Sequence, residues 1–163
     1  MTSLSDYLEA RAAADLAKGI TGLAAAAARI SSEIRAPHSV LDALAGEVNA
    51  DGDTQKALDV LADEIILEAA RNVGAAAYMS EEREAAIPLA DDGGFIIASD
   101  PLDGSSNIGV NVSIGTIFSI LPTEGAGLIN GRQQLAAGFF VYGPQTTLLV
   151  TVGAGVASFR MDA

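Results

Sequence analysis

The residues best suited to chemistry form one run of eight, Asp-Pro-Leu-Asp-Gly-Ser-Ser-Asn, at positions 100–107. The proline favours a tight turn, which would bring Asp100 and Asp103 within about 7 Å of each other and let both carboxylates face one cation. The glycine that follows lets the backbone approach a ligand closely, and the two serines offer donors that suit phosphate oxygens. The run therefore predicts a metal ion beside a phosphate.

The same run also fits a simpler structure, the start of a helix that holds no metal. Aspartate at the N-cap and N3 positions, with proline at N1, is a common helix beginning in which both acids offset the helix dipole. The following residues favour a strand instead. Residues 104–109 have poor helix propensity, and residues 110–115 alternate between apolar and polar or small side chains. A long helix that begins at this run therefore fits the sequence badly.

Four segments in order carry a resemblance to a known family. The run at 100–107, together with Val-Ser-Ile-Gly-Thr-Ile-Phe at 112–118, resembles the signature of class I fructose-1,6-bisphosphatase, within the magnesium-dependent, lithium-sensitive sugar phosphatases. The further matches are Gly-Asp-Thr-Gln-Lys-Ala-Leu-Asp at 52–59, Ser-Glu-Glu at 80–82 and Ala-Ala-Gly-Phe-Phe-Val-Tyr-Gly at 136–143. The resemblance covers roughly residues 20–161, but only the first half of the family's usual length.

The resemblance implies a role for each matching residue. The implied metal ligands are Glu81, Asp100, Asp103 and the carbonyl of Leu102. The implied catalytic residues are Asp59, Glu82 and Asp53, of which Asp59 and Glu82 would orient a water molecule and accept its proton. The implied substrate-binding residues are Asp103, Gly104, Ser105 and Ser106, which would hold the phosphate that is removed. The implied cofactor is magnesium, as two or more ions, with manganese as an alternative.

Acidic residues outside the signature would not stand out by themselves. Asp59 and Asp63 lie four residues apart on one face of a predicted helix, a pattern typical of solvated surface. Adjacent glutamates such as Glu81 and Glu82 are also common on surfaces. Arg83 stands where the family often has an acidic residue, and we expect it to point outward.

Composition limits the partners of the chain. Its 163 residues, 50% of them hydrophobic, with a mean hydropathy of +0.34, predict one folded domain with a real core. Nine basic and 21 acidic residues give a net charge of −12, which argues against nucleic acid or an anionic membrane as partner. An anionic sugar phosphate would also be repelled unless a bound cation reversed the local field.

The location that we expect is cytoplasmic. The chain has no cysteine, which excludes disulfides and thiolate chemistry. No signal peptide is evident at its start, and no apolar run reaches the roughly 18 residues that a membrane-spanning helix needs. The single histidine, His38, follows a proline after a predicted helix, where a surface or capping role is expected.

The order of predicted elements indicates the α+β class, with amino-terminal helices packed on a mainly antiparallel sheet. We expect one domain over residues 1–163, which the resemblance makes the amino-terminal half of a sugar phosphatase fold. The predicted helices span 6–35, with a break near Gly19 and Gly22, and 54–71, after a polar loop at 45–53. The predicted strands span 75–79, 95–99, 112–121, 134–142, 146–152 and 156–161, and turns include 124–127 and 130–131.

The expected function follows from the resemblance. It is metal-dependent hydrolysis of the 1-phosphate of fructose 1,6-bisphosphate, in gluconeogenesis or the carbon-fixation cycle, by a dimer or tetramer. Two alternatives stay open, a sedoheptulose-1,7-bisphosphatase and a non-catalytic fragment that binds metal or phosphate. Only Arg132 and Arg160 are basic after residue 104, so little in the chain would hold a second phosphate. We therefore expect weak or no activity from these residues alone.

Overall fold

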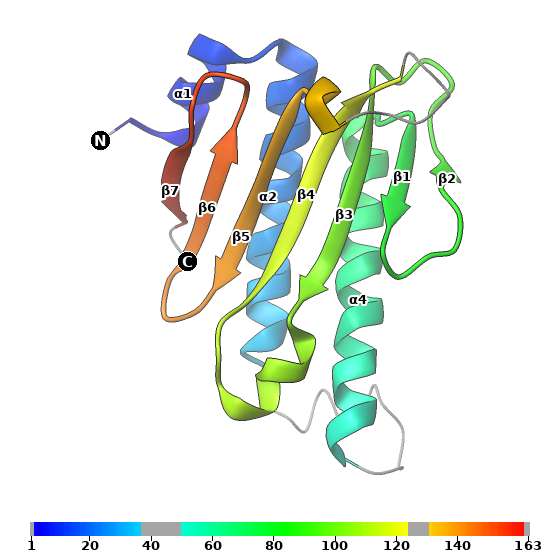
Figure 1. Ribbon diagram of the computed structural model, residues 1–163, viewed down its shortest axis with the longest axis vertical. Coiled ribbons are helices and arrows are strands. Elements are labelled where there is room, and N and C mark those ends of the chain that lie inside the picture. The colour runs from blue at the N-terminus through cyan, green and yellow to red at the C-terminus, as the bar shows by residue number, and fades with distance from the viewer. Residues whose placement is uncertain (1, 37–49, 124–130, 162–163) are drawn as a thin grey trace.

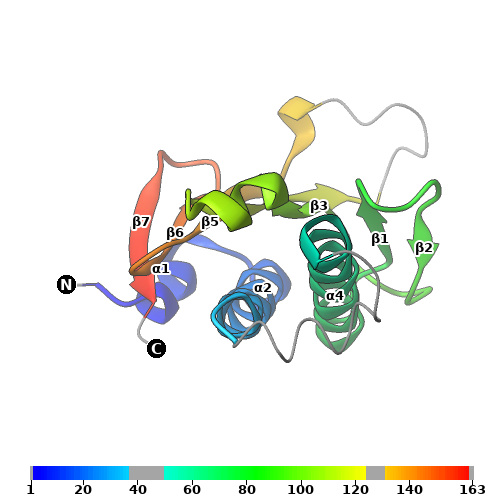
Figure 2. The same ribbon diagram turned by 90° about the horizontal axis from the view of Figure 1, so that it is seen from below.

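The chain folds as helices packed on one face of a seven-stranded sheet (Figures 1 and 2). This computed structural model describes residues 2–36, 50–123 and 131–161, with only the backbone described at 50–55. Seen from below in Figure 2, α1, α2 and α4 all lie on the same side of the sheet. No helix within the described ranges is long and apolar enough to cross a membrane. The predicted α+β class is confirmed.

The amino-terminal segment forms two helices, α1 (Leu4–Arg11) and α2 (Ala14–Ile34). A capping box between Ser3 and Asp6 begins α1, since each side chain accepts a hydrogen bond from the other residue's backbone N–H. The predicted break at the two glycines is wrong, because the chain bends at residues 12–13 instead. Gly19 and Gly22 lie inside α2, where the absence of side chains allows close packing against Phe95 and Val73.

Helix α4 (Ala50–Val73) packs beside α2 and covers the other half of the sheet. Its predicted apolar stripe is confirmed, since Leu58, Ala62, Ile65 and Ile66 are buried in the core. The helix begins earlier than predicted. The polar loop expected at 45–53 is wrong for residues 50–53, which are helical. Several other predictions lie outside the described residues, namely those for residues 45–49, for His38, for the turn at 124–127 and for residue 130.

The sheet is antiparallel except at one pair of strands. Its strands are β1 (Ala77–Ser80), β2 (Ile87–Pro88), β3 (Phe95–Asp103), β4 (Ile114–Pro122), β5 (Ala136–Tyr142), β6 (Thr146–Thr151) and β7 (Ala157–Met161). They are arranged in the order β2-β1-β3-β4-β5-β6-β7, in which β1 and β3 are parallel. From β3 to β7 each strand pairs with the next along the chain, which confirms the predicted meander.

The signature run adopts neither of the two conformations that the sequence suggested. Asp100 pairs with Ile117 and Asp103 with Gly115 in the continuous strand β3, with an irregularity in register between the two aspartates. The tight turn and the helix start are therefore both wrong, because pairing with β4 keeps the segment extended. After Gly104 comes a 3-10 helix, η1 (Ser105–Val110), and β4 begins two residues later than predicted.

Candidate active site

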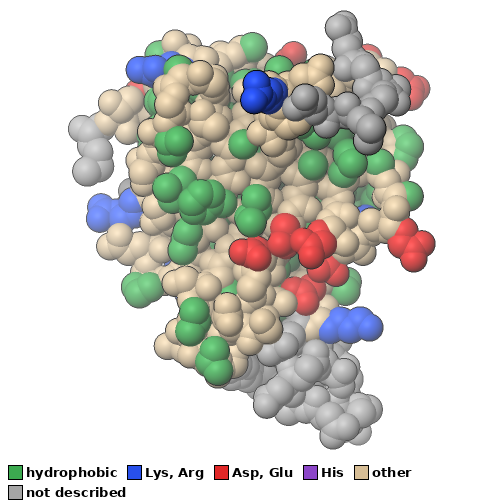
Figure 3. Space-filling model, in the orientation of Figure 1, with side chains coloured by type: hydrophobic (Ala, Val, Ile, Leu, Met, Phe, Trp, Pro, Cys, Tyr) green, Lys and Arg blue, Asp and Glu red, His purple; other side chains and the backbone are tan. Residues whose placement is uncertain are grey.

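The parallel pair of strands places two carboxylates side by side. Ser80, the last residue of β1, is in register with Ser99 of β3. The N–H of Glu81 continues the ladder by donating to the Ser99 carbonyl over 3.1 Å. Glu81 and Asp100 therefore follow at the same level on neighbouring strands. Figure 3 shows acidic side chains gathered on this face of the molecule.

Asp100 is the most strongly perturbed carboxyl group of this cluster. Burial, followed by a hydrogen bond with Glu81 and the negative charges of Glu81 and Asp103, raises the pKa of Asp100 to about 6. Its Oδ1 accepts a hydrogen bond from the N–H of Leu102 over 3.2 Å, which fixes the side chain against its own strand. Two carboxyl groups this close compete for a proton when no cation lies between them.

We expect the variant Asp100→Asn to stabilise the metal-free chain at neutral pH. The ordinary pKa of an aspartate is near 3.8, so between pH 4 and 6 the folded chain holds a proton that the unfolded chain releases. Stability therefore falls as the pH rises through this range. The half-exposed position allows solvent screening, so we expect a gain of about 1–2 kcal/mol at pH 7.5 that vanishes near pH 4.

Urea unfolding in a chelating buffer at both pH values measures this gain. The variant Asp92→Asn, at an exposed turn residue, is the matched control. A gain that is the same at pH 4 and pH 7.5 would contradict the assigned cause.

A second group of polar residues connects α4 to the residues after β3. Ser105 Oγ donates to Asp59 Oδ2 over 3.2 Å. Burial raises the pKa of Asp59, and the hydrogen bond from Ser105 lowers it in part. Burial also raises the pKa of Glu82, to which the charges of Asp59, Asp63 and Glu81 add. Asp59 and Glu82 thus lie close enough for the charge of Asp59 to act on the pKa of Glu82.

The residues expected to cradle a phosphate follow the end of β3. Gly104 has a φ of +77°, a conformation that favours glycine, and its carbonyl accepts a hydrogen bond from the N–H of Asn107 over 2.8 Å. Ser105 is half-buried beside Asp59, whereas Ser106 and Asp103 are exposed. These residues lie next to one another at the end of the strand that carries Asp100.

A buried hydroxyl pair holds this end of β3 in place. Thr116 Oγ1 donates to the Pro101 carbonyl over 2.7 Å and lies 2.6 Å from the Tyr142 hydroxyl. Because the only hydroxyl proton of Thr116 is used on that carbonyl, the Tyr142 hydroxyl donates to Thr116. Burial raises the pKa of Tyr142, so it keeps this proton. Strand β5 therefore supports the segment between the two aspartates.

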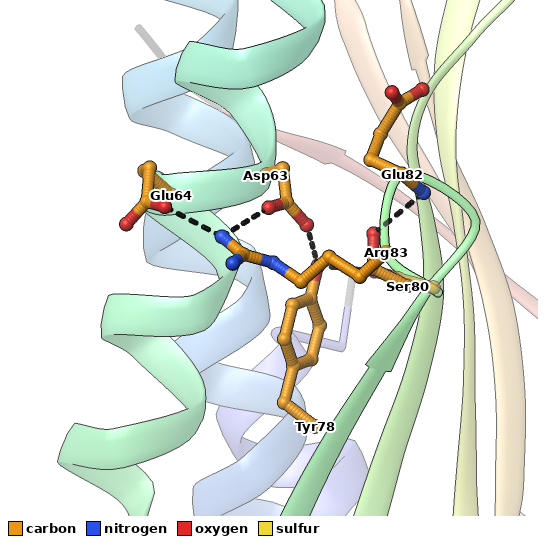
Figure 4. A network of polar contacts seen from close by, with 7 residues as sticks. Asp63, Glu64, Tyr78, Ser80, Glu82 and Arg83 are labelled. Atoms are coloured by element: carbon orange, nitrogen blue, oxygen red, sulfur yellow. Dashed lines mark hydrogen bonds and ion pairs between the residues drawn. The ribbon is translucent and has the colours of Figure 1, made fainter. Parts of the chain in front are cut away.

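Two residues near the site differ from the sequence-based expectation. Asp63 is only 3% exposed, so its assignment to solvated surface is wrong. Arg83 does not point outward, since its Nη2 lies 2.5 Å from Asp63 Oδ2 and 2.5 Å from Glu64 Oε1 (Figure 4). Both partners come from a distant part of the chain, and no local pattern marks them. Asp53 lies in the first turn of α4, where only the backbone is described.

The carboxylate pair is suited to a hard divalent cation. Within the described part of the chain, no three acidic or histidine side chains converge as a complete metal-binding group. Magnesium does not need one, because it keeps several waters and is commonly held by one or two carboxylates together with phosphate oxygens. The hydrogen bond between Asp100 and Glu81 and the raised pKa of Asp100 mark a position where a cation would replace a proton.

The open face of the sheet is hollowed beside these carboxylates. A cavity of about 590 Å³ is bordered by Glu81 and Asp100 and has a mostly apolar lining that includes Ile117, Phe139 and Leu149. Ile117 and Phe139 are exposed by 46% and 42%. The site therefore has an acidic edge and an apolar floor.

The fold and the cluster of carboxylates together resemble an α+β sugar phosphatase domain. Residues 4–163 match the family model described as "Fructose-1-6-bisphosphatase, N-terminal domain". The chain therefore belongs to the fructose-1,6-bisphosphatase family, of whose amino-terminal domain it has the sequence and the fold. The resemblance carried by the four segments is confirmed.

Curated relatives agree with this family. A protein of Paracoccus denitrificans named "Fructose-1,6-bisphosphatase class 1" is 44% identical over 151 residues, 90% of this chain and 45% of its own length. A protein of the same name from Methylorubrum extorquens is 43% identical over 173 aligned positions, 99% of this chain and 50% of its own length. The chain thus spans about half the length of these relatives.

A solved structure shares the fold. The crystal structure of Leishmania major fructose-1,6-bisphosphatase in holo form matches 99% of this chain and 51% of its own, with a TM-score of 0.83 and 28% sequence identity. The mixed seven-stranded sheet with helices on one face is therefore the family's arrangement, and the expected sugar phosphatase fold is confirmed.

Proposed function

We propose that this chain supplies the metal- and phosphate-binding half of an enzyme that hydrolyses the 1-phosphate of fructose 1,6-bisphosphate to fructose 6-phosphate and phosphate. The observation that carries the proposal is the approach of three elements, α4, β1 and β3, with Asp59, Glu82, Glu81 and Asp100 at one place. The names of the relatives support the substrate. These relatives are about twice as long as this chain, so the complete reaction is proposed for a longer protein that contains these residues.

Each residue group has a distinct role in this reaction. Glu81, Asp100, Asp103 and the Leu102 carbonyl would hold the cation. When bound, two or more magnesium ions, or manganese in their place, would supply charge neutralisation at the phosphoryl group and acidify a bound water. The amides and hydroxyls of Gly104, Ser105 and Ser106 would bind the departing phosphate, which the net charge of −12 would otherwise repel.

Asp59 and Glu82 would accept the proton of the attacking water. The pKa of both groups is raised, by burial and, for Glu82, also by neighbouring negative charges, which makes each a better base than an unperturbed carboxylate. Ser105 keeps one oxygen of Asp59 oriented toward the phosphate-binding turn. Asp53, which matches the family's Gly-Asp position, would assist this proton transfer from the start of α4.

Binding of the second phosphate requires groups that the chain provides sparsely. Arg132 and Arg160 are the only basic residues after position 104. We infer that further cationic groups come from the additional sequence that the relatives have, or from another subunit of a dimer or tetramer. A cytoplasmic location fits this reaction.

Phosphate release from fructose 1,6-bisphosphate tests the proposal. We expect magnesium-dependent release from a longer protein that contains these residues, and release at least about 100-fold slower from the 163-residue chain, because the second phosphate is poorly held. A titration of magnesium from zero to millimolar, with sedoheptulose 1,7-bisphosphate as a second substrate, would measure both. Absence of metal-dependent release in both proteins would contradict the proposed activity.

A non-catalytic role is the second candidate, and the length comparison favours it. The chain covers only 45–50% of the first two relatives, so it could bind cation and phosphate without turnover. Magnesium binding by the 163-residue chain, together with activity of the longer protein only, would assign it this role.

A further inference from the structure

A buried polar network connects the three elements that carry the site. Ser99 and Tyr78 hydroxyls lie 2.9 Å apart, and the Tyr78 hydroxyl donates to Asp63 Oδ1 over 2.9 Å. Because the Tyr78 proton is used on the carboxylate, Ser99 donates to Tyr78. Arg83 completes the network from the far side of Asp63 (Figure 4). The network thus joins β3, β1, α4 and the turn after β1.

Three of the four members of the network lie next to a proposed site residue in the sequence or one helical turn from it. Ser99 directly precedes Asp100, and Asp63 lies one helical turn after Asp59 on α4. Arg83 directly follows Glu82. A shift of Ser99, Asp63 or Arg83 would therefore move the carboxylate near it.

The turn that carries the two glutamates is closed at Ser80. The Arg83 N–H donates to the Ser80 carbonyl over 3.2 Å, and the Glu82 N–H donates to Ser80 Oγ over 3.2 Å. The guanidinium then reaches back to α4, where Asp63 is 3% exposed and cannot exchange this partner for water. In Figure 4 the Glu82 side chain points away from the guanidinium, so Arg83 leaves that carboxylate open.

We propose that Arg83, through its ion pair with buried Asp63, positions the turn at Glu81 and Glu82 against α4 and so sets the geometry of the metal-binding carboxylates. Arg83 is a positioning residue, since it binds neither cation nor substrate. This inference rests on the metal site of the proposed function and adds a residue to which the sequence comparison gave no role.

A purely electrostatic role for Arg83 would have the opposite effect on metal affinity. A cation near two glutamates repels a divalent ion, so its removal would strengthen metal binding. Loss of a positioning residue would weaken binding, because the ligands would no longer be held together. The sign of the change therefore separates the two roles.

Calorimetric titration of the 163-residue chain with Mn²⁺, at a temperature where circular dichroism shows a folded protein, tests the proposal. We expect Arg83→Met to weaken Mn²⁺ binding about 10-fold to 100-fold. The matched control is Arg29→Met, which removes an exposed ion pair between Arg29 and Glu68 and the same charge. We expect it to leave the affinity unchanged. Arg83→Lys, which retains the charge, should restore part of the affinity.

A double variant separates positioning from folding. Asp63→Asn combined with Arg83→Met keeps the net charge and leaves no unpaired buried carboxylate, and we expect it to fold even where Arg83→Met alone does not. It should bind Mn²⁺ as weakly as a folded Arg83→Met. In a Glu81→Gln background, Arg83→Met should cause no further loss, because the ligand that it positions is already removed.

Two results would overturn the inference in different ways. In the first, the unmodified chain binds Mn²⁺, and the folded Arg83→Met variant and the double variant bind it equally well or more tightly. This result would overturn the positioning role alone. Wild-type chain without Mn²⁺ affinity would overturn the metal site of the proposed function, and the positioning role with it.

Discussion

The variant Asp59→Asn is expected to lower kcat by about 10²- to 10⁴-fold in whichever protein containing this chain shows turnover. An amide cannot accept the proton of the attacking water, whereas its shape and its hydrogen bond from Ser105 are retained. The fold should not suffer. Burial raises the pKa of Asp59, so its charged form is disfavoured in the folded state and a neutral amide removes that cost.

Steady-state phosphate release and thermal unfolding, measured together, check this expectation. KM should change less than kcat, because the substrate contacts proposed for Gly104, Ser105 and Ser106 are untouched. Asp92→Asn again serves as the control, since it makes the same chemical change at an exposed turn. Turnover within a factor of about three of the unmodified protein would rule out Asp59 as the proton acceptor.

The variant Thr116→Val should have the largest effect on stability, with a loss of about 2–4 kcal/mol. Valine retains the size of threonine but leaves the Pro101 carbonyl and the Tyr142 hydroxyl without this partner in the core. Each buried polar group left unpaired costs roughly 1–3 kcal/mol. Since Pro101 lies between Asp100 and Asp103, metal affinity should fall as well.

Urea unfolding at pH 7.5 measures this loss. A domain of this size should also show a decrease in Tm of about 5–15 °C. The control is Thr147→Val, at a half-buried position of β6. If the two variants lower the free energy of unfolding equally, the hydrogen bonds of Thr116 with Pro101 and Tyr142 contribute no special stability.

The sequence was sufficient to predict the elements whose pattern is repeated along the chain. The apolar stripe of α4 repeats over several turns, so a small error in its start does not change which face is buried. Strands β4 to β7 are separated by glycine-rich or polar turns, which set their limits to within about two residues. Glycines inside α2 misled the prediction, because their role is close packing with Val73 and Phe95 rather than a break.

The conformation of the signature was not predictable from local turn chemistry. Proline at position 101 favours a turn, but pairing of Asp100 with Ile117 and of Asp103 with Gly115 holds the segment extended. The strand with which this run pairs, β4, follows only after the 3-10 helix η1. The pairing therefore cannot be predicted from the eight residues alone. That these residues bind metal and phosphate stays a prediction, although the tight turn that was expected to bring the two aspartates together is absent.

The buried network could not be predicted for a related reason. Asp63 and Arg83 are 20 positions apart, and their contact requires β1 to pack beside α4. Aspartate and arginine are both residue types that are usually found on the surface. Only the assembled fold brings a carboxylate, a phenol and a guanidinium into one buried chain of hydrogen bonds.

The parallel pairing of β1 and β3 has a consequence for how the site tolerates changes in chain length. Glu81 and Asp100 are neighbours because Ser80 and Ser99 are in register, not because of the number of residues between them. Insertions near the exposed residues 84–86 would lengthen the crossover and leave this register intact. A single residue inserted within β1 or β3 would turn the following carboxylate to the opposite face of the sheet. The connection between β1 and β3 can therefore change in length without separating the two carboxylates, whereas the two strands must keep their lengths.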